Sequence, residues 1–250
     1  MARRDEIVLA TKVFGEMAGQ PHLKGLSRRA ILYNIDASLA RLKTDHVDLY
    51  QIHRWDSDTP IEETMLALHD VVISGKARYI GASSMPAWKF AKAQQVARTN
   101  GWTPFIAMQN QISLLYREEE REMIPLCRDQ GVGLIPWSPI ARGRLARPAG
   151  TETDRTGKDA YMKYLFDRTQ EADAKVIAEV QRLAVELGRP MAQVALAWVR
   201  EKPGVTAPII GVTKADQLTE AVAGLSLTLT PDQIARLEAP YIPHQPLGLE

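Results

Sequence analysis

The feature that most constrains the fold is a regular alternation of short apolar runs with longer helical patterns. Each apolar run is rich in residues that favour β-structure, and each is followed by a stretch with helical spacing. The six predicted strands are Glu6–Val13, Val47–His53, Ala77–Ser84, Pro104–Gln111, Val132–Pro139 and Thr206–Val212. Strands that alternate with helices in this way predict a parallel sheet with helices outside it, either open or curled into a barrel.

The predicted helices carry recognisable start and stop signals. Ser27 is a candidate N-cap, and Pro60 and Gly75 mark the two ends of the second helix. Pro125 lies inside the fourth pattern and is expected to kink or shorten that helix. The predicted helices are Ser27–Leu42, Pro60–Lys76, Pro86–Thr99, Arg117–Gly131, Asp173–Leu187, Arg189–Glu201, Lys214–Leu225 and Thr230–Pro240.

One segment, Ala141–Asp173, breaks this rhythm because it is polar and has few candidates for a core. Loops of this length are uncommon and are usually lids or binding loops. The segment is either a surface excursion or a lid beside a site at the carboxyl end of a parallel strand. The lid is the favoured interpretation.

Length and composition restrict the class of protein. A chain of 250 residues suits one α/β domain over residues 1–250, and a net charge of +1 argues against nucleic-acid or membrane-surface partners. A single cysteine, Cys127, cannot form an internal disulfide. No apolar run is long enough to cross a bilayer, so we expect a cytoplasmic protein.

Polar and aromatic residues collect at the predicted carboxyl ends of the strands. A lone histidine or lysine at such a place is more often structural, but a whole rim of such residues indicates a ligand site. The rim consists of Lys12, His53, Ser83, Ser84, Asn110, Gln111, Trp137, Ser138, Gly211, Val212 and Thr213. The chain has no G-x-G-x-x-G motif, no P-loop, no nucleophile elbow and no zinc-ligand spacing, so no metal is expected.

Several motifs along most of the chain resemble the aldo-keto reductase family. They include "IVLATKVF", "VDLYQIHRWD", "GKARYIGASS", "IPWSPIARGRL" and "PIIGVTKADQLTEAV". The resemblance is strongest to the bacterial branch that is similar to potassium-channel β-subunits. It implies a (β/α)8 TIM-barrel fold that binds NADP(H) without a Rossmann domain and reduces aldehyde or ketone carbonyls of small molecules. An oligomer is compatible with it.

The resemblance also implies roles for individual residues. Of the family's Asp, Tyr, Lys and His tetrad, Lys12 and His53 match the lysine and the histidine. His53 would hydrogen-bond the carbonyl oxygen, and Lys12 would lower the pKa of the proton-donating tyrosine. The residues matched to the cofactor are Ser83, Ser84, Gln111, Trp137, Ser138, Pro139, Ile140, Arg142, Gly143, Gly211, Thr213, Lys214, Gln217 and Glu220.

Within this set, Ser83, Ser84 and Gln111 would hold the nicotinamide carboxamide, and Trp137 would stack on the nicotinamide ring. The 138–143 loop would follow the pyrophosphate, and Lys214 would meet the 2′-phosphate. Ser84 stands where the family has asparagine, and Gln217 stands where it often has arginine. The second difference leaves the choice of NADP(H) over NAD(H) open.

The catalytic tyrosine and aspartate have no match among the residues of this chain. The family places both in its first two βα units, so we expect a chain that lacks these units and holds six of eight strands. A misplaced or cut start, residues missing from the sequence and a genuine short form are the alternatives. Function therefore has alternatives too: a reductase, a catalytically incomplete nucleotide-binding or partner-regulating protein, or a non-functional fragment.

Overall fold

The computed structural model describes residues 3–17, 19–151 and 160–246, and it divides into two compact units. Of the described residues, the first unit comprises 3–17, 19–109 and 126–133, and the second comprises 110–125, 134–151 and 160–246. Among the described residues, no helix combines the length and apolarity needed to cross a membrane.

The first unit alternates strands and helices. Its elements are η1 (Arg4–Glu6), β1 (Ala10–Val13), α1 (Arg28–Leu42), β2 (Val47–Ile52), α2 (Ile61–Ile73), β3 (Ala77–Ser83), α3 (Ala87–Asn100) and β4 (Ala107–Gln109). Helix α4 (Met123–Asp129) and β5 (Gly133–Leu134) each contain residues of both units.

The second unit is mainly helical. Its elements are η2 (Glu118–Glu120), η3 (Ala141–Ala146), α5 (Ala160–Phe166), η4 (Asp167–Thr169), α6 (Gln170–Leu187), α7 (Met191–Arg200), α8 (Ala215–Ala223), η5 (Gly224–Ser226) and α9 (Pro231–Glu238).

The strands form one open sheet in the order β1–β2–β3–β4–β5, and the first three neighbouring pairs are parallel. Lys12 pairs with Gln51, and Ser83 pairs with Gln109. The prediction of an α/β fold with a parallel sheet is therefore confirmed. The (β/α)8 barrel stays a prediction, because the strands of the described residues do not close on themselves.

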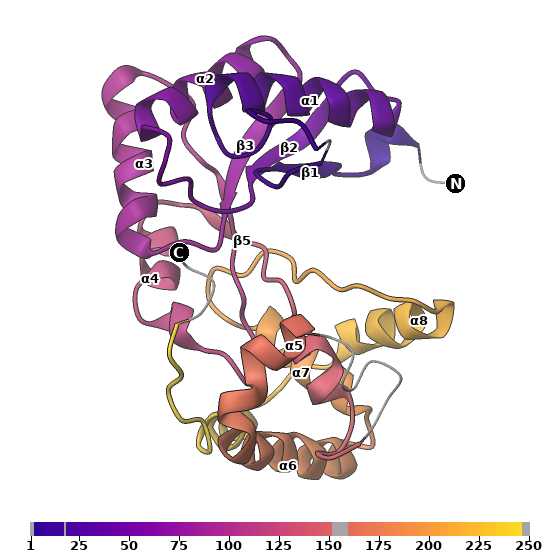
Figure 1. Cartoon of the computed structure of the whole chain (residues 1–250). Helices are drawn as coiled ribbons and strands as arrows, with labels where there is room; N and C mark the ends of the chain where they lie inside the picture. The colour runs from indigo at the N-terminus through magenta and orange to yellow at the C-terminus, as the bar shows by residue number, and fades with distance from the viewer. Residues whose placement is uncertain (1–2, 18, 152–159, 247–250) are drawn as a thin grey trace. The chain divides into compact units, whose positions relative to one another are not determined.

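Helices α1 and α2 cover one face of the strands (Figure 1). The hydroxyl group of Tyr50 in β2 donates a hydrogen bond to the Ile31 carbonyl of α1, so Tyr50 points toward this helical layer. Phe90 of α3 stacks on Phe105 with ring centres 5.9 Å apart. Because successive strand residues face opposite sides, Gln51 lies on the other face of the sheet.

Two predicted strands are shorter than expected because side chains bind their backbone groups. In the first, Asp48 accepts a hydrogen bond from the Leu9 amide at 2.7 Å, and the strand begins only at Ala10. In the fourth, the Gln94 amide bonds both the N–H and the carbonyl of Phe105, so β4 begins at Ala107. A backbone group held by a side chain is not available to the ladder.

The segment 206–212, predicted as a sixth strand, is not a strand in the described structure. Within the described residues this segment forms one isolated parallel bridge, between Ile209 and Trp137, and a second bridge, between Val205 and Leu134, lies just before it. Pro136 and Pro208 lie inside the paired segments, and proline has no N–H to continue a ladder. Five strands are therefore observed where the sequence suggested six.

Helix boundaries agree better with the predictions. Ser27 caps α1 by accepting a hydrogen bond from the Ala30 amide, and Thr230 caps α9 through the Gln233 amide. Pro125 is the third residue of α4, where a missing N–H leaves no helical bond unmade, and the expected helix is split into η2 and α4.

The polar segment Ala141–Asp173 contains more regular structure than a loop. Residues 152–159 lie outside the described part, but η3, α5, η4 and the start of α6 occupy most of the remainder. Leu145, Leu165 and Phe166 are buried, so this segment contributes to the core of the second unit. The number of buried apolar residues is small, as expected, but the expected long loop is replaced by short helices. A lid function stays a prediction.

The second unit contains a buried carboxyl group, Glu119, which is bound by Asn110. Asn110 donates a hydrogen bond to the Glu119 carboxyl at 2.6 Å, and Glu119 is only 6% exposed. Burial, followed by the neighbouring charge of Glu118, raises the pKa of Glu119 to about 8, although the Asn110 hydrogen bond opposes this shift. Glu119 is therefore protonated in the folded protein at neutral pH.

This carboxyl group should make stability depend on pH. Because the folded pKa lies above that of an unfolded glutamate, the stabilising contribution is complete below about pH 4.5 and is lost as the pH rises through about 8. We expect the free energy of unfolding to fall by up to ~1.4 kcal/mol per pH unit in this window. Urea denaturation at several pH values would measure it.

The control pair is Glu119→Gln and Glu122→Gln. Glutamine at position 119 has nearly the shape of a protonated glutamate but does not titrate, so the slope of the free energy of unfolding against pH should flatten. The exposed Glu122 should leave it unchanged. Equal slopes for Glu119→Gln and the parent protein would contradict the assignment.

Candidate active site

The two predicted catalytic residues lie on neighbouring strands of the first unit. Lys12 belongs to β1, and His53 follows the last residue of β2, with its amide bonded to the Val13 carbonyl at 2.9 Å. Lys12 pairs with Gln51, which precedes His53 by two residues. Strand alternation therefore places all three side chains on the face away from α1.

Electrostatics at this edge favour neutral groups. Desolvation of the imidazole by the surrounding protein, followed by the charges of Arg54 and Lys12, lowers the pKa of His53 to about 4. His53 is therefore neutral at pH 7 and carries one ring N–H that can donate to an oxygen. Burial and Arg54 also lower the pKa of Lys12, and no carboxylate opposes the shift.

Ser83 and Ser84 lie at the end of β3. The Ser83 hydroxyl donates to the Gln109 carbonyl at 2.8 Å, and the Ser84 amide donates to the same oxygen at 3.2 Å. Both side chains are buried, and Ser84 has a positive φ of 41°. The hydroxyl oxygens can still accept hydrogen bonds, so this pair can hold an amide N–H.

Two glutamines of the same face were not singled out from the sequence. The side-chain amide nitrogen of Gln109 donates a hydrogen bond to the side-chain oxygen of Gln51 at 3.3 Å, and both side chains are buried. Gly81 lies between them: a Cβ there would lie 3.1 Å from the Ala107 carbonyl and 3.2 Å from the Gln51 side chain. Gln51 could have been found from the sequence, because it lies two residues before His53 in a strand and alternate strand residues share a face.

Gln111, predicted to join Ser83, lies instead in the second unit. It forms a single parallel bridge with Trp137, whereas Gln109 is the residue paired with Ser83. The Gln111 side chain is buried, and among the described residues its amide nitrogen and oxygen have no hydrogen-bond partner. A buried amide with both groups free suits a carboxamide, so Gln111 stays a candidate beside Gln109.

Trp137 starts a loop with unusual backbone angles. Its ring lies 6.3 Å from that of Tyr161, over which the Arg142 guanidinium is placed at 5.6 Å. Within the six residues that follow, four have positive φ angles: Ser138, Ala141, Arg142 and Gly143. Non-glycine residues in this region carry strain that is often found at functional sites, and such turns form concave sites for anions. Pro139 and Ile140 complete the predicted pyrophosphate loop.

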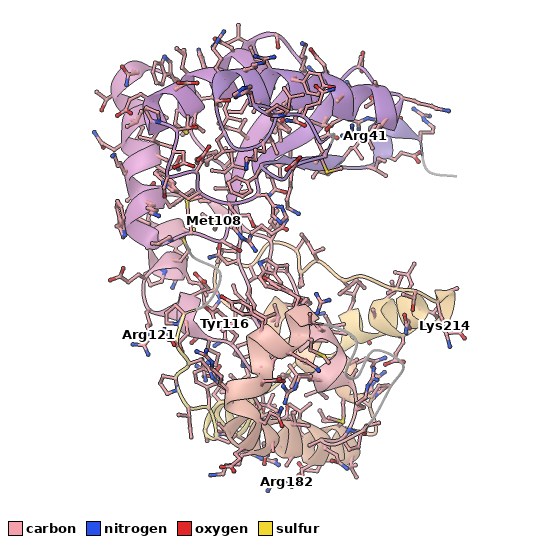
Figure 2. The ribbon with its side chains drawn as sticks, in the orientation of Figure 1. Arg41, Met108, Tyr116, Arg121, Arg182 and Lys214 are labelled. Carbon is pink, nitrogen blue, oxygen red and sulfur yellow. The ribbon has the colours of Figure 1, made fainter. Side chains whose placement is uncertain are left out.

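The predicted adenosine-end residues surround the start of α8. Gly211, Thr213, Lys214 and Glu220 are exposed, and Figure 2 shows Lys214 at the beginning of this helix. The side-chain oxygen of Gln217 accepts hydrogen bonds from the Thr213 backbone amide at 2.9 Å and from the Lys214 backbone amide at 3.4 Å. Gln217 therefore caps its own helix.

The predicted site residues thus fall into two sets, one in each unit. Lys12, His53, Ser83 and Ser84 belong to the first unit, and the loop after Trp137 and the start of α8 belong to the second. Their combination in a single site stays a prediction.

The fold and the strand-end residues define an α/β protein with candidate ligand groups at the carboxyl ends of parallel strands. Comparison with known proteins makes the class specific. The sequence model of the Aldo/keto reductase family matches residues 1–242, and the chain belongs to this family.

Three relatives illustrate the match. Versiconal hemiacetal acetate reductase of Aspergillus parasiticus is 54% identical over 221 residues, which are 88% of this chain and 64% of that protein. Aldo-keto reductase AFTS1 of Alternaria alternata is 44% identical over 94% of this chain and 65% of its own. Putative aryl-alcohol dehydrogenase AAD16 of Saccharomyces cerevisiae is 44% identical over 89% and 64%, respectively.

These relatives are fungal aldo-keto reductases and related proteins. The predicted similarity to the bacterial branch that is close to potassium-channel β-subunits is therefore wrong, because these relatives are fungal proteins. The chain spans slightly less than two thirds of the length of the curated relatives described here.

Proposed function

We propose that this chain belongs to an enzyme that reduces aldehyde or ketone carbonyls to alcohols with NADP(H). The observation that carries the proposal is a neutral His53 at the end of β2, on the same face as Lys12. Membership of the aldo/keto reductase family and relatives named as reductases support it. The family generally uses NAD(P)H.

The residues present fit such a cofactor. The unpaired buried amide of Gln111 is complementary to a carboxamide, and the strained loop from Ser138 to Gly143 suits phosphate oxygens. Lys214 at the start of α8 is the candidate that would favour a 2′-phosphate. When bound, NADP(H) would supply the hydride.

His53 and Lys12 would contribute two separate effects. Addition of a hydride leaves negative charge on the carbonyl oxygen, and a neutral imidazole N–H placed there stabilises the developing charge. The ammonium group of Lys12 would lower the pKa of a nearby phenol toward neutral pH. The sequence offers no predicted counterpart for that phenol or for the aspartate partner of Lys12.

A turnover assay tests the proposal. Purified protein would be mixed with NADPH and a panel of aldehydes while the absorbance of the reduced nicotinamide is followed. The same assay would use a longer form that supplies the Asp and Tyr. No NADPH oxidation by either form would overturn the proposal.

A nucleotide-binding protein without turnover is the second candidate, favoured because no carboxylate among the described residues opposes the lowered pKa of Lys12. It predicts quenching of Trp137 fluorescence by NADPH without steady-state oxidation. No quenching would exclude it. We further propose one barrel domain over residues 1–250. Oligomeric state and cytoplasmic location stay predictions.

A further inference from the structure

Tyr161, in the first turn of α5, contacts two residues that are assigned to the cofactor. Its ring centre lies 6.3 Å from that of Trp137, with 32° between the two ring planes. The guanidinium carbon of Arg142 lies 5.6 Å from the centre of the same tyrosine ring. Trp137 is the candidate for the nicotinamide, and Arg142 belongs to the candidate pyrophosphate loop. One side chain of the second unit therefore joins two parts of the candidate cofactor site.

The other end of α5 is attached to the same loop. Phe166, the last residue of α5, is 2% exposed, and the guanidinium carbon of Arg144 lies 5.1 Å from its ring centre. Arg144 also donates a hydrogen bond to the Phe166 carbonyl at 3.5 Å. Arg142 and Arg144 thus connect the chain that follows Trp137 to both ends of α5, and these two contacts fix the place of Tyr161.

Tyr161 itself is not a core residue. Its side chain is 38% exposed, and Tyr164, which stacks on it with ring centres 6.0 Å apart, is 52% exposed. The buried residues of this helix are Leu165 and Phe166. Loss of an exposed ring costs little stability compared with deletion of a core side chain. The contacts of Tyr161 therefore act on the order of its neighbours more than on folding.

The geometry of these contacts suits ligand binding by both partners. The Trp137 and Tyr161 rings are in offset contact, which does not cover a whole face of the indole. A cation–π contact uses the charge of a guanidinium and not its N–H groups, which are the donors that recognise phosphate oxygens. A ligand binds more weakly when it must first order the side chains that hold it. Tyr161 orders both groups before a cofactor arrives.

We propose that Tyr161 is a positioning residue for the cofactor. Its ring fixes the Trp137 indole and the Arg142 guanidinium together, so that the nicotinamide and the pyrophosphate meet groups that are already in place. The inference rests on the proposed function, because it requires that NADP(H) binds to these residues. It predicts that the aromatic ring of Tyr161, and not its hydroxyl group, sets the affinity.

Isothermal titration calorimetry of the full chain with NADPH tests this role without turnover. Tyr161→Leu keeps apolar volume for packing but has no aromatic face, and it should raise the Kd about tenfold, the value of one aromatic pair. Tyr161→Phe keeps that face and should bind within about twofold of the parent protein. The matched control is Tyr33→Leu in α1, where the tyrosine is 44% exposed, and it should leave the Kd unchanged.

A double-mutant cycle with Arg142→Gln separates positioning from packing. Alone, Arg142→Gln should raise the Kd about fivefold, the effect of one solvent-exposed ion pair. In the Tyr161→Leu background the same change should raise the Kd by less than about twofold, because a guanidinium that is not positioned contributes little. If Tyr161 only packed α5 against the core, the two effects would be additive.

Each result has a separate meaning. If the parent protein binds no NADPH, the proposed function and this role both fail. If the parent protein binds NADPH but Tyr161→Leu has the same Kd, the cycle is additive, or Tyr161→Phe binds as weakly as Tyr161→Leu, only the role of Tyr161 is wrong. Tighter binding by Tyr161→Leu would show that the tyrosine occupies the place of the nicotinamide, and it would also overturn the role.

Discussion

Replacement of His53 by alanine is expected to lower kcat/KM for aldehyde reduction by about 10²–10³-fold, the usual cost of removing one donor to a developing oxyanion. The imidazole is neutral at pH 7 because its pKa is lowered to about 4, so it acts as a hydrogen-bond donor and not as a cation. His53→Gln retains an N–H donor and should keep more activity than His53→Ala. Steady-state kinetics in the form of the protein that turns over would measure both.

His46 provides the matched control for this series. His46 and His53 flank β2 at opposite ends, and the His46 Nδ1 atom lies 2.6 Å from the Asp45 carboxylate, outside the candidate site. His46→Ala should leave kcat/KM within about twofold of the parent protein, since this half-buried residue is not among the candidate site residues. NADPH binding should survive His53→Ala. Equal losses in the two alanine variants would refute a specific role for His53.

The pH dependence of activity follows from the same pKa. His53 stays neutral until the pH falls to about 4, so protonation of His53 should not reduce the rate between pH 5 and 8. An unperturbed histidine would instead begin to lose activity below about pH 6.5. A decline in kcat/KM near pH 6.5 that disappears in His53→Gln would contradict the lowered pKa.

Replacement of Trp198 by alanine is expected to destabilise the protein by about 3–5 kcal/mol, the range for deletion of a large aromatic side chain from a core. Trp198 in α7 is 1% exposed, and its indole N–H donates to Glu238 at 2.8 Å. The Lys202 ammonium lies 4.3 Å from the ring centre. Alanine therefore removes a buried volume and a cation–π contact at once. Chemical denaturation would measure the loss.

Trp198→Phe separates packing from hydrogen bonding. Phenylalanine keeps most of the buried surface, and Glu238 retains Lys202 at 2.6 Å and Arg117 at 2.9 Å as partners. We expect a smaller loss, about 1–2 kcal/mol, with an unchanged dependence on denaturant concentration. A loss below about 1 kcal/mol for Trp198→Ala would show that the surrounding core collapses into the space.

Much of the architecture of the first unit could be predicted from local patterns. The spacing of apolar residues located both ends of α1 and α3 within one residue and those of α2 within three residues. Ser27 was recognised as a cap because its hydroxyl acts on an amide only three residues away. The alternation of strands and helices indicated a parallel sheet. The same order placed Lys12 and His53 near the carboxyl ends of their strands.

Strand lengths could not be predicted in this way. Gln94 is eleven residues from Phe105, yet its amide shortens β4, and Asp48 is 39 residues from the Leu9 amide that it binds. The failed sixth strand has a similar origin, since Pro136 and Pro208 matter only when their segments are side by side. These effects depend on partners that sequence periodicity does not reveal.

The candidate site shows the same division. The sequence by itself determined that Lys12, His53, Ser83 and Ser84 follow or end strands, because a strand and its last residue are local properties. Only the tertiary structure decided that the Gln51 and Gln109 side chains meet across Gly81, and that desolvation by the surrounding protein, followed by the charges of Arg54 and Lys12, lowers the pKa of His53. Register and electrostatic fields depend on distances between chain segments, and folding alone sets those distances.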